Sequence, residues 1–427
     1  MHIGYACLAL GVPGTGLRKC LLKNATEQRL RELIAANLDA LERMVDYNIG
    51  NGIRLYRISS DIIPFASSPV MTVPWARDYA QRLSSLGQKI RDAGMRVSMH
   101  PGQYTVLNSP SESIAQNAAL ELSYHACLLD ALGMDARHKI ILHVGGAYGD
   151  KPAAMARFSE RYARLPRAVR ARLVLENDDR IFTVSDVLTL AGMAGMPVVY
   201  DNLHNAANPS PEGGDDATWI RRCAATWRTE DGEQKIHYSQ PAPDQKIGAH
   251  SQSISAQAFL SFVNGLPTPA PDIMLEVKDK NLSALKCILL TQEHAGLAAL
   301  EREWGRYKYR VLEHSQRQYR EIRALLKDKA GYPAAAFYRL VETALALPVA
   351  VGDAVNAAQH VWGYFKRSAT PAQRRAYADA LEGYRTGRVP LNRLKRVLYR
   401  MAEAYREDYL LASYYFLEDA ADGAAAK

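Results

Sequence analysis

Residues 139–201 carry the pattern that decides the fold: KIILHV (139–144), RLVLE (172–176) and PVVYD (197–201) are short apolar runs separated by longer helix-forming segments. Runs that are apolar almost throughout are typical of strands buried on both faces of a parallel sheet. Helices in the intervening segments would serve as crossovers between parallel strands. The stretch therefore predicts consecutive β–α units.

The same alternation extends through about the first three hundred residues. Eight strand-like runs are found: His2–Leu10, Ile53–Ser60, Arg96–His100, Lys139–Val144, Arg172–Glu176, Pro197–Asp201, Lys235–Ser239 and Asp272–Val277. The clearest helical patterns between them are Thr26–Val45 with a Thr N-cap, Trp75–Ala93 before Gly94, and Ser113–Leu132 before Gly133. Eight strands that alternate with helices predict an α/β fold of the (β/α)₈ TIM-barrel type.

An open, doubly wound sheet is the alternative α/β fold. The segment Gly11-Val12-Pro13-Gly14-Thr15-Gly16 follows the first run and contains several glycines, as a dinucleotide-binding turn does. Its proline, and the lack of a helical pattern directly after it, disagree with such a turn, which must open a helix. We therefore expect a loop here and a barrel overall.

A region of different composition begins near Arg310. It is rich in Ala, Leu, Tyr and Arg, and its helical patterns start with Tyr307–Lys327 and break at 369–371 and 387–390. We therefore expect an all-α domain after the barrel. The predicted boundaries are residues 1–305 for the barrel domain and 306–427 for the helical C-terminal domain.

The overall composition is that of a globular protein without membrane segments. The 427 residues are 48% hydrophobic, and no apolar run reaches the ~18 residues that a membrane span requires. The N-terminus lacks the basic and apolar regions of a signal peptide, and the five cysteines form no CxxC pair. We therefore expect a cytoplasmic monomer with reduced thiols and no membrane partner. The net charge is +8, and the segment from Arg310 onward contributes most of it, with 19 Lys and Arg against 13 Asp and Glu, which permits a polyanionic partner.

The ends of the predicted strands carry the residues that point to function. From the third strand to the eighth, each strand ends in, or is closely followed by, His, Asp or Glu: His100, His143, Glu176, Asp201 with His204, His237 with His250, and Glu276. In a TIM barrel the carboxyl ends of all strands meet at one rim, where active sites form. Five histidines and three carboxylates are thus predicted to face one small volume.

Nitrogen and oxygen ligands without thiolates suit Mn²⁺, Zn²⁺ or Fe²⁺. Eight ligands exceed the need of one ion, so we expect about two or three ions, an arrangement that fits phosphoryl chemistry. Each residue also has a structural alternative, because a lone His is more often a satisfied core residue, and Asp201 or Glu276 alone could cap a helix or pair with an arginine. The six other histidines do not lie at the C-terminal end of a predicted strand, so the recurrence at six consecutive strands favours the metal interpretation.

Several motifs resemble the UV-damage endonuclease family and follow the same order along the chain. They are Ile3-Gly-Tyr5, Arg57-Ile-Ser-Ser60-Asp61, His100-Pro-Gly-Gln103-Tyr104, Leu142-His143-Val-Gly-Gly146, Leu175-Glu176-Asn-Asp178, Asp201-x-x-His204 and Lys235-x-His237-Tyr-Ser239. The resemblance covers roughly residues 1–290. It implies a DNA-repair endonuclease that acts on damaged double-stranded DNA. Such an enzyme would hydrolyse the phosphodiester 5′ to a UV photoproduct or another distorting lesion, leaving a 3′-hydroxyl and a 5′-phosphate, with Mn²⁺ as the expected metal.

The resemblance also implies roles for individual residues. One ion would be held by His100, His143 and Glu176. Glu176 would bridge to a second ion, held also by Asp201, His237 and Glu276, and a third would lie between His204 and His250. The catalytic residues would be Glu176, Lys235 and His237.

Three further residues would act on the DNA. Gln103 and Tyr104 would wedge into the duplex opposite the lesion, and Tyr5 would help to form the pocket for the flipped nucleotides. Lys235 matches a lysine that is carboxylated in the family; a plain ammonium facing a phosphate is the alternative. For Gln103 and Tyr104 the alternative is an ordinary exposed loop.

The helical extension resembles a bacterial domain of unknown function. The motifs are Glu313-His-Ser-Gln316, His360-Val-Trp-Gly-Tyr-Phe-Lys366 and Tyr384-Arg-Thr-Gly-Arg-Val-Pro-Leu391. Its basic clusters could follow a phosphate backbone or form a solvated helical face, and an unidentified partner of this domain is expected.

Three other functions stay open. An abasic-site endonuclease of the endonuclease IV type would use the same metals, although Gln103, Tyr104 and Lys235 favour the UV-damage branch. A metal-dependent sugar isomerase or epimerase would need fewer ligands. A non-enzymatic barrel that binds damaged DNA and recruits partners would be expected to lack one or more of the ligands.

Overall fold

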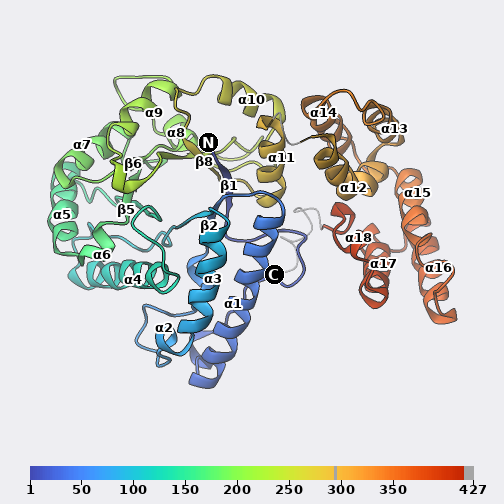
Figure 1. Cartoon of the computed structure of the whole chain (residues 1–427), viewed down its shortest axis with the longest axis horizontal. Helices are drawn as coiled ribbons and strands as arrows, with labels where there is room; N and C mark the ends of the chain where they lie inside the picture. Colours follow the sequence, from blue (N-terminus) through green and yellow to red (C-terminus); the bar gives the residue numbers. More distant parts are fainter. Residues whose placement is uncertain (293–295, 418–427) are drawn as a thin grey trace. The chain divides into compact units, whose positions relative to one another are not determined.

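The computed structural model describes residues 1–292 and 296–417, so the last ten residues of the predicted second domain lie outside the described part. Its described strands form one sheet, and each overlaps a run expected from the sequence (Figure 1). The strands are β1 (Ile3–Ala6), β2 (Leu55–Ile58), β3 (Arg96–Met99), β4 (Ile140–His143), β5 (Leu173–Glu176), β6 (Val198–Val199), β7 (Lys235–Tyr238) and β8 (Asp272–Leu275).

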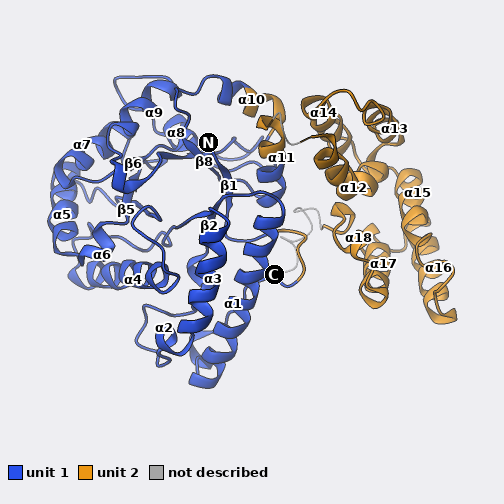
Figure 2. Cartoon of the chain, viewed as in Figure 1, with its two compact units in different colours: residues 1–9, 14–254, 261–285 blue, residues 10–13, 255–260, 286–427 orange. Residues whose placement is uncertain are grey.

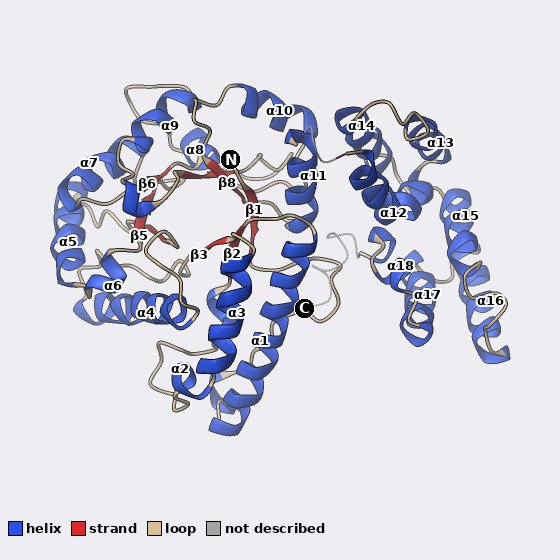
Figure 3. Ribbon diagram, viewed as in Figure 1, coloured by secondary structure: helices blue, strands red, loops and turns tan. Residues whose placement is uncertain are grey.

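The sheet confirms the predicted barrel. All described ladders are parallel, and the strand order β6-β5-β4-β3-β2-β1-β8-β7 follows the chain around a ring. Between β6 and β7 the ring is joined by a single parallel bridge from Asp201 to His237, in which the His237 N–H donates to the Tyr200 carbonyl at 2.8 Å. Figure 3 shows the strands enclosed by helices. The carboxyl ends of the strands therefore lie at one rim, as the metal hypothesis requires.

Helices fill the connections between the strands, as expected for β–α units. They are α1 (Glu27–Gly50), α2 (Trp75–Asp78), α3 (Ala80–Asp92), α4 (Glu112–Ala131), α5 (Lys151–Arg164), α6 (Arg167–Arg170), α7 (Val184–Ala194), α8 (Asn202–Ala207), α9 (Asp216–Ala224), α10 (Ala256–Asn264) and α11 (Asn281–Thr291).

Local sequence signals explain several helix ends. The Thr26 side chain accepts a hydrogen bond from the Arg29 N–H at 3.3 Å and so caps α1 as predicted. Gly94 and Gly133 adopt positive φ (60° and 68°) just after α3 and α4, a conformation that glycine adopts without steric cost. The helix expected over Trp75–Ala93 is divided at Tyr79, whose backbone leaves the helical range (φ −111°, ψ 15°) and whose hydroxyl donates to the Arg31 carbonyl.

The described part of the chain from residue 296 to residue 417 forms helices and no strand. Its helices are α12 (Leu297–His314), α13 (Gln316–Leu325), α14 (Ala334–Leu345), α15 (Val351–Trp362), α16 (Pro371–Arg385), α17 (Leu391–Tyr405) and α18 (Asp408–Leu411). The helical stretch predicted over Tyr307–Lys327 lies in α12 and α13 and is divided at Ser315, which is extended (φ −162°, ψ 114°) and whose side chain caps α13 by accepting from the Gln318 N–H. The predicted breaks before Pro371 and Leu391 are confirmed.

The chain divides into two compact units (Figure 2). The first comprises Met1–Ala9, Gly14–Ile254 and Ser261–Leu285, and the second comprises Leu10–Pro13, Ser255–Leu260 and Lys286–Lys427. The second unit has its own apolar core, in which Ala357, Leu394, Leu398 and Tyr415 are fully buried. The domain boundary at 305/306 stays a prediction.

Two expectations from composition can be compared with the described residues. In that part of the chain, no helix combines the length and the apolar character needed to cross a membrane. The five cysteines form no disulfide bond there.

Candidate metal centre

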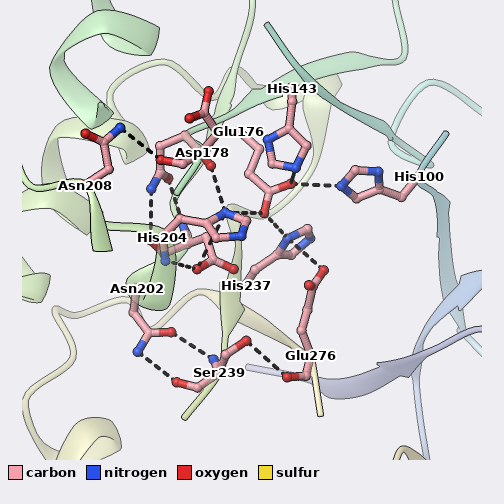
Figure 4. Close-up of polar contacts among 12 residues, drawn as sticks. His100, His143, Glu176, Asp178, Asn202, His204, Asn208, His237, Ser239 and Glu276 are labelled. Carbon is pink, nitrogen blue, oxygen red and sulfur yellow. Dashed lines mark hydrogen bonds and ion pairs between the residues drawn. The ribbon is translucent and has the colours of Figure 1, made fainter. Parts of the chain in front are cut away.

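Glu176 is the centre of a cluster of side chains at the carboxyl rim of the barrel (Figure 4). It is the last residue of β5 and is fully buried. Its Oε2 lies 2.9 Å from His100 Nε2 and 3.4 Å from His143 Nε2, and its Oε1 lies 2.6 Å from His237 Nδ1 and 3.7 Å from His204 Nδ1. One carboxylate thus contacts four of the five histidines that the sequence singles out.

The strands place these histidines. His143 ends β4 and is in register with Glu176, while His100 directly follows β3 and His237 lies within β7. The imidazole rings lie side by side, with centroids 5.3 Å apart for His100 and His143 and 5.4 Å apart for His143 and His204. Because the strands are parallel and end at the same rim, the side chains at their ends converge on Glu176 without a long loop.

Asp201 and His204 come from the turn into α8. Asp201 caps this helix by accepting from the His204 N–H at 2.7 Å. Asn177 clamps the turn: its Nδ2 donates to the Asp201 carbonyl at 3.0 Å and its Oδ1 accepts from the Asp201 N–H at 2.9 Å. The Asn177 carbonyl also lies 2.9 Å from His204 Nδ1. Asp201 therefore does cap a helix, as the structural alternative proposed. Its second carboxylate oxygen, Oδ2, has no hydrogen-bond partner in the described structure.

Glu276 joins the cluster from the end of β8. Its Oε1 lies 3.3 Å from His237 Nδ1 and forms an ion pair with Arg57 Nη1. Sequence reasoning did not assign Arg57 a role of its own, although a charged residue inside an otherwise apolar strand, β2, is a signal that could have identified it. Arg57 holds the Glu276 carboxylate toward the cluster.

The residues present fit metal ions. Three groups have ligand atoms within 4.8 Å of one another: His100 with His143 and Glu176, Glu176 with Asp201 and His204, and Glu176 with His237 and Glu276. Three polar atoms of these residues are buried without a hydrogen-bond partner in the described structure, namely His143 Nδ1, His237 Nε2 and Asp201 Oδ2. Orphaned buried polar atoms are rare in native proteins unless an ion or water satisfies them. A donor set of imidazoles and carboxylates matches the metals expected from the sequence.

The electrostatics of the cluster also fit a bound metal ion. Burial raises the pKa of a carboxyl group, but the neighbouring histidines, His237 and His143 first, hold the pKa of Glu176 well below its usual range. Burial lowers the pKa of His204, yet Asp201 and Glu176 outweigh it and raise that pKa to about 9. The His204 imidazolium thus supplies positive charge beside Asp201 and Glu176, a role that a bound cation would take over.

His250 is only partly brought into the cluster. Its Nδ1 lies 2.8 Å from the Glu276 carbonyl and 3.8 Å from Glu276 Oε2, and the three ligand groups found in the described residues do not include it. His204 is grouped instead with Glu176 and Asp201. A third ion between His204 and His250 stays a prediction.

A pocket of about 360 Å³ opens beside the cluster. His100, His143, His204 and Glu276 line it together with Arg57 and Gln103. Gln103 is exposed, and the next residue, Tyr104, is 84% exposed, so both side chains are free to meet a ligand that enters from this side. Their roles as wedge residues stay predictions.

Tyr5 lies in β1, and its role in a lesion pocket stays a prediction. It is fully buried, its ring centroid is 5.3 Å from that of Tyr56, and its hydroxyl donates to Asn48 Oδ1 at 2.9 Å. Successive side chains of a strand point to opposite faces, and Tyr5 is in register with Tyr56, the neighbour of the pocket-lining Arg57. The Tyr5 ring therefore points away from the face of Arg57 and toward α1. A direct contact with flipped nucleotides would require this ring to become exposed.

Lys235 is the first residue of β7 and is buried. Burial, together with the positive charges of Arg96 and Arg57, lowers its pKa well below the ordinary value for lysine. An uncharged amine is the form that reacts as a nucleophile. Its carboxylation and its catalytic role stay predictions.

Comparison with known proteins finds two matching family models and several relatives. The family model "UV-endonuclease UvdE" matches residues 4–303, and the model "Protein of unknown function (DUF1722)" matches residues 308–418. The UV DNA damage endonuclease of Clostridium perfringens is 38% identical over 336 residues, which make up 77% of this chain and 80% of that relative. The protein of the same name from Bacillus velezensis is 33% identical over 287 residues, covering 67% of this chain and 88% of the relative.

A solved structure agrees in fold. The crystal structure of SacUVDE matches with a TM-score of 0.64 and 36% identity, over 67% of this chain and 96% of that one. The family model covers well over half of the chain, including every residue of the cluster around Glu176. The chain therefore belongs to the UV-endonuclease UvdE family, with a C-terminal region that matches a domain of unknown function.

Proposed function

We propose that this protein is a metal-dependent DNA-repair endonuclease that incises damaged double-stranded DNA 5′ to UV photoproducts and other distorting lesions. The observation that carries the proposal is the convergence of four histidines and the Glu276 carboxylate on Glu176 at the rim of the barrel. The relatives named UV DNA damage endonuclease support the choice of substrate.

Two or three ions, with Mn²⁺ expected before Zn²⁺ or Fe²⁺, would be held by His100, His143, Glu176, Asp201, His204, His237, His250 and Glu276. Ions in such a cluster supply an activated water and stabilise negative charge when a phosphodiester is hydrolysed. Glu176 is suited to bridge two ions because its two oxygens face different histidines. The products would carry a 3′-hydroxyl and a 5′-phosphate.

Residues around the cluster would position the substrate. Arg57 is held beside the cluster by Glu276 and places a permanent positive charge in the pocket that a phosphate would enter. Asn177 fixes the backbone that carries Asp201 and His204, so these ligands are oriented before an ion binds. Lys235 and His237 would complete the catalytic set.

Lesion choice would come from the loop after β3. Gln103 offers an amide and Tyr104 an aromatic ring, groups that can replace hydrogen bonds and stacking lost when bases leave the duplex. Opening a distorted site costs less free energy than opening an intact one. The deformability of the DNA would therefore determine lesion choice more than base identity does.

Incision of end-labelled duplexes by the full chain tests the proposal. One duplex carries a thymine dimer, one an abasic site and one no damage, each with Mn²⁺ or with EDTA. A metal-dependent cut 5′ to the dimer is expected. A cut at the abasic site alone would indicate an endonuclease IV type of activity, and no cut in any duplex would refute the proposal.

A further inference from the structure

A second pocket lies at the amino ends of the strands, opposite to the rim that holds the metal centre. Its volume is about 340 Å³. Its lining comes from segments that directly precede β5, β6 and β7: Arg167 and Arg170 from α6, Gly195 from the turn after α7, and Arg228 and Asp231 next to β7. Tyr162, on α5, completes the wall. Its lining does not overlap that of the pocket beside the metal centre.

The three arginines of this pocket differ from their neighbours in having no carboxylate partner within the described residues. Nearby on the same end of the barrel, Arg137 pairs with Asp135 at 2.5 Å and Arg172 pairs with Asp130 at 2.6 Å. Unpaired guanidinium groups around one cavity repel one another. An anion that binds in the cavity reduces this repulsion, so its binding is favoured.

The acidic residues of the pocket do not neutralise these arginines. Asp231 directs one oxygen to Lys139 Nζ at 2.5 Å, and its other oxygen accepts from the backbone N–H of Arg228 at 3.0 Å. Glu230 is exposed at the pocket and forms no ion pair in the described part of the chain. The cavity therefore keeps a net positive charge.

Two contacts show how closely the groups approach one another. A Cβ atom added at Gly195 would lie 3.4 Å from Arg228 Nη2, so the guanidinium rests against the glycine backbone. The Tyr162 hydroxyl donates to the Arg170 carbonyl at 3.2 Å. Burial raises the pKa of this hydroxyl, and the positive charges of Arg170 and Arg228 oppose that shift.

We propose that this pocket is a binding site for a phosphate dianion, either free or as a monoester of a small molecule. The planar guanidinium fork pairs with phosphate oxygens through two parallel hydrogen bonds, which makes arginine the preferred partner of this group. The cavity has the size of a small-molecule site. The site is separate from the proposed endonuclease centre and does not depend on its activity.

Isothermal titration of the full chain with inorganic phosphate, and separately with thymidine 5′-monophosphate, tests the site. The key variant replaces both Arg170 and Arg228 with Ala. Arg164→Ala is the matched control, because Arg164 lies at the end of α5 but pairs with Glu160 and does not line the pocket. Arg228→Lys keeps the charge and removes the fork, so weakened binding there would show that fork geometry contributes.

We expect the double substitution to weaken binding about a hundredfold, because it removes two charge-assisted pairs and each contributes on the order of a factor of ten. Arg164→Ala should leave binding unchanged. Binding of phosphate at the metal centre would persist in the double variant. The readout is therefore the difference in binding between the wild type and the double variant. Tighter binding of the nucleotide would identify a monoester as the ligand, and tighter binding of inorganic phosphate would identify the free ion.

Two results would overturn the proposal: no binding of either probe up to roughly 10 mM, or binding that the double substitution does not change. Melting temperatures without phosphate verify that each variant is folded. If the double variant does not fold, Arg167→Ala, at an exposed position, replaces it with the same expected direction.

Discussion

Replacing Arg57 with Met tests how charge is balanced in the metal centre. In the structure Arg57 Nη1 pairs with Glu276 Oε1, and the two side chains are only 12% and 13% exposed. Met keeps most of the apolar stem but removes the positive charge. The Glu276 carboxylate is then left buried beside the imidazoles of His237, whose Nδ1 lies 3.3 Å away, and His250, whose Nδ1 lies 3.8 Å away.

The magnitude follows from the burial of the pair. Removing one partner of a buried ion pair costs about 3–5 kcal/mol, and the residual exposure and His237 place this pair near the lower end, about 3 kcal/mol. For a domain of this size, that loss lowers the melting temperature by about 6 °C. Bound metal would neutralise Glu276 in place of Arg57, so with Mn²⁺ the loss should fall below about 1 kcal/mol.

Thermal unfolding of the full chain in EDTA and in Mn²⁺ measures both values. Arg82→Met is the control, because Arg82 pairs with Asp39 on the surface, with 31% and 62% exposure, and should cost less than about 1 kcal/mol in either buffer. We expect Mn²⁺ to stabilise Arg57→Met more than the wild type. An equal loss in both buffers would refute the argument that an ion takes over the charge of Arg57 at Glu276.

Three further predictions concern the two ends of the barrel. Glu176→Gln should bind fewer ions and show no incision on a gel, because an amide cannot bridge two cations, whereas Glu160→Gln on the surface should behave like the wild type; turnover in Glu176→Gln would defeat the cluster model. Gln103→Ala combined with Tyr104→Ala should lower the preference for a damaged over an intact duplex about tenfold with metal content unchanged, and loss of metal would show that this loop supports the ligands instead. Burial lowers the pKa of His138 to about 4 from 6.5, so its neutral form stabilises the fold near neutral pH and this contribution is lost as the pH falls. Urea unfolding at about pH 7 and pH 5 should show a loss of about 2 kcal/mol that is absent in His138→Gln, and an equal loss in both proteins would contradict this assignment.

The parts of the centre that the sequence predicted are those fixed by strand ends. His100, His143 and Glu176 could be brought together from one rule, because parallel strands end at one rim whatever the loops do. The alternation of eight strand-like runs with helices predicted the barrel, and the observed strand order follows the chain around it. The number of strands could be predicted because each strand is a short apolar run between helical patterns.

The contacts and distances that the sequence did not predict depend on loops and on long-range partners. Asp201 and His204 share a turn that Asn177 holds, and their distances follow from that clamp rather than from any periodicity. The pair of Arg57 and Glu276 joins residues more than two hundred positions apart. The family-like motif likewise did not predict the packing of Tyr5, whose ring the alternation of β1 turns toward α1.

The helical region shows a limit of a different kind. Ser315 is compatible with a helix interior and with an N-cap, so the helical pattern over Tyr307–Lys327 did not indicate a break there. The extended backbone at Ser315 resolves the choice, because its side chain then caps α13. Propensity alone could not decide between the two states, since both use the same residue well.

The central claim is that the cluster around Glu176 holds the metal ions that incise damaged DNA. The most direct measurement titrates Mn²⁺ into chelator-stripped full chain, and follows bound ions and incision of a duplex with a single thymine dimer in the same samples. Incision should appear only as about two or more ions bind per chain, and a duplex without the dimer should stay intact. Incision of the dimer duplex by the metal-free chain, or full metal binding without incision, would contradict the claim.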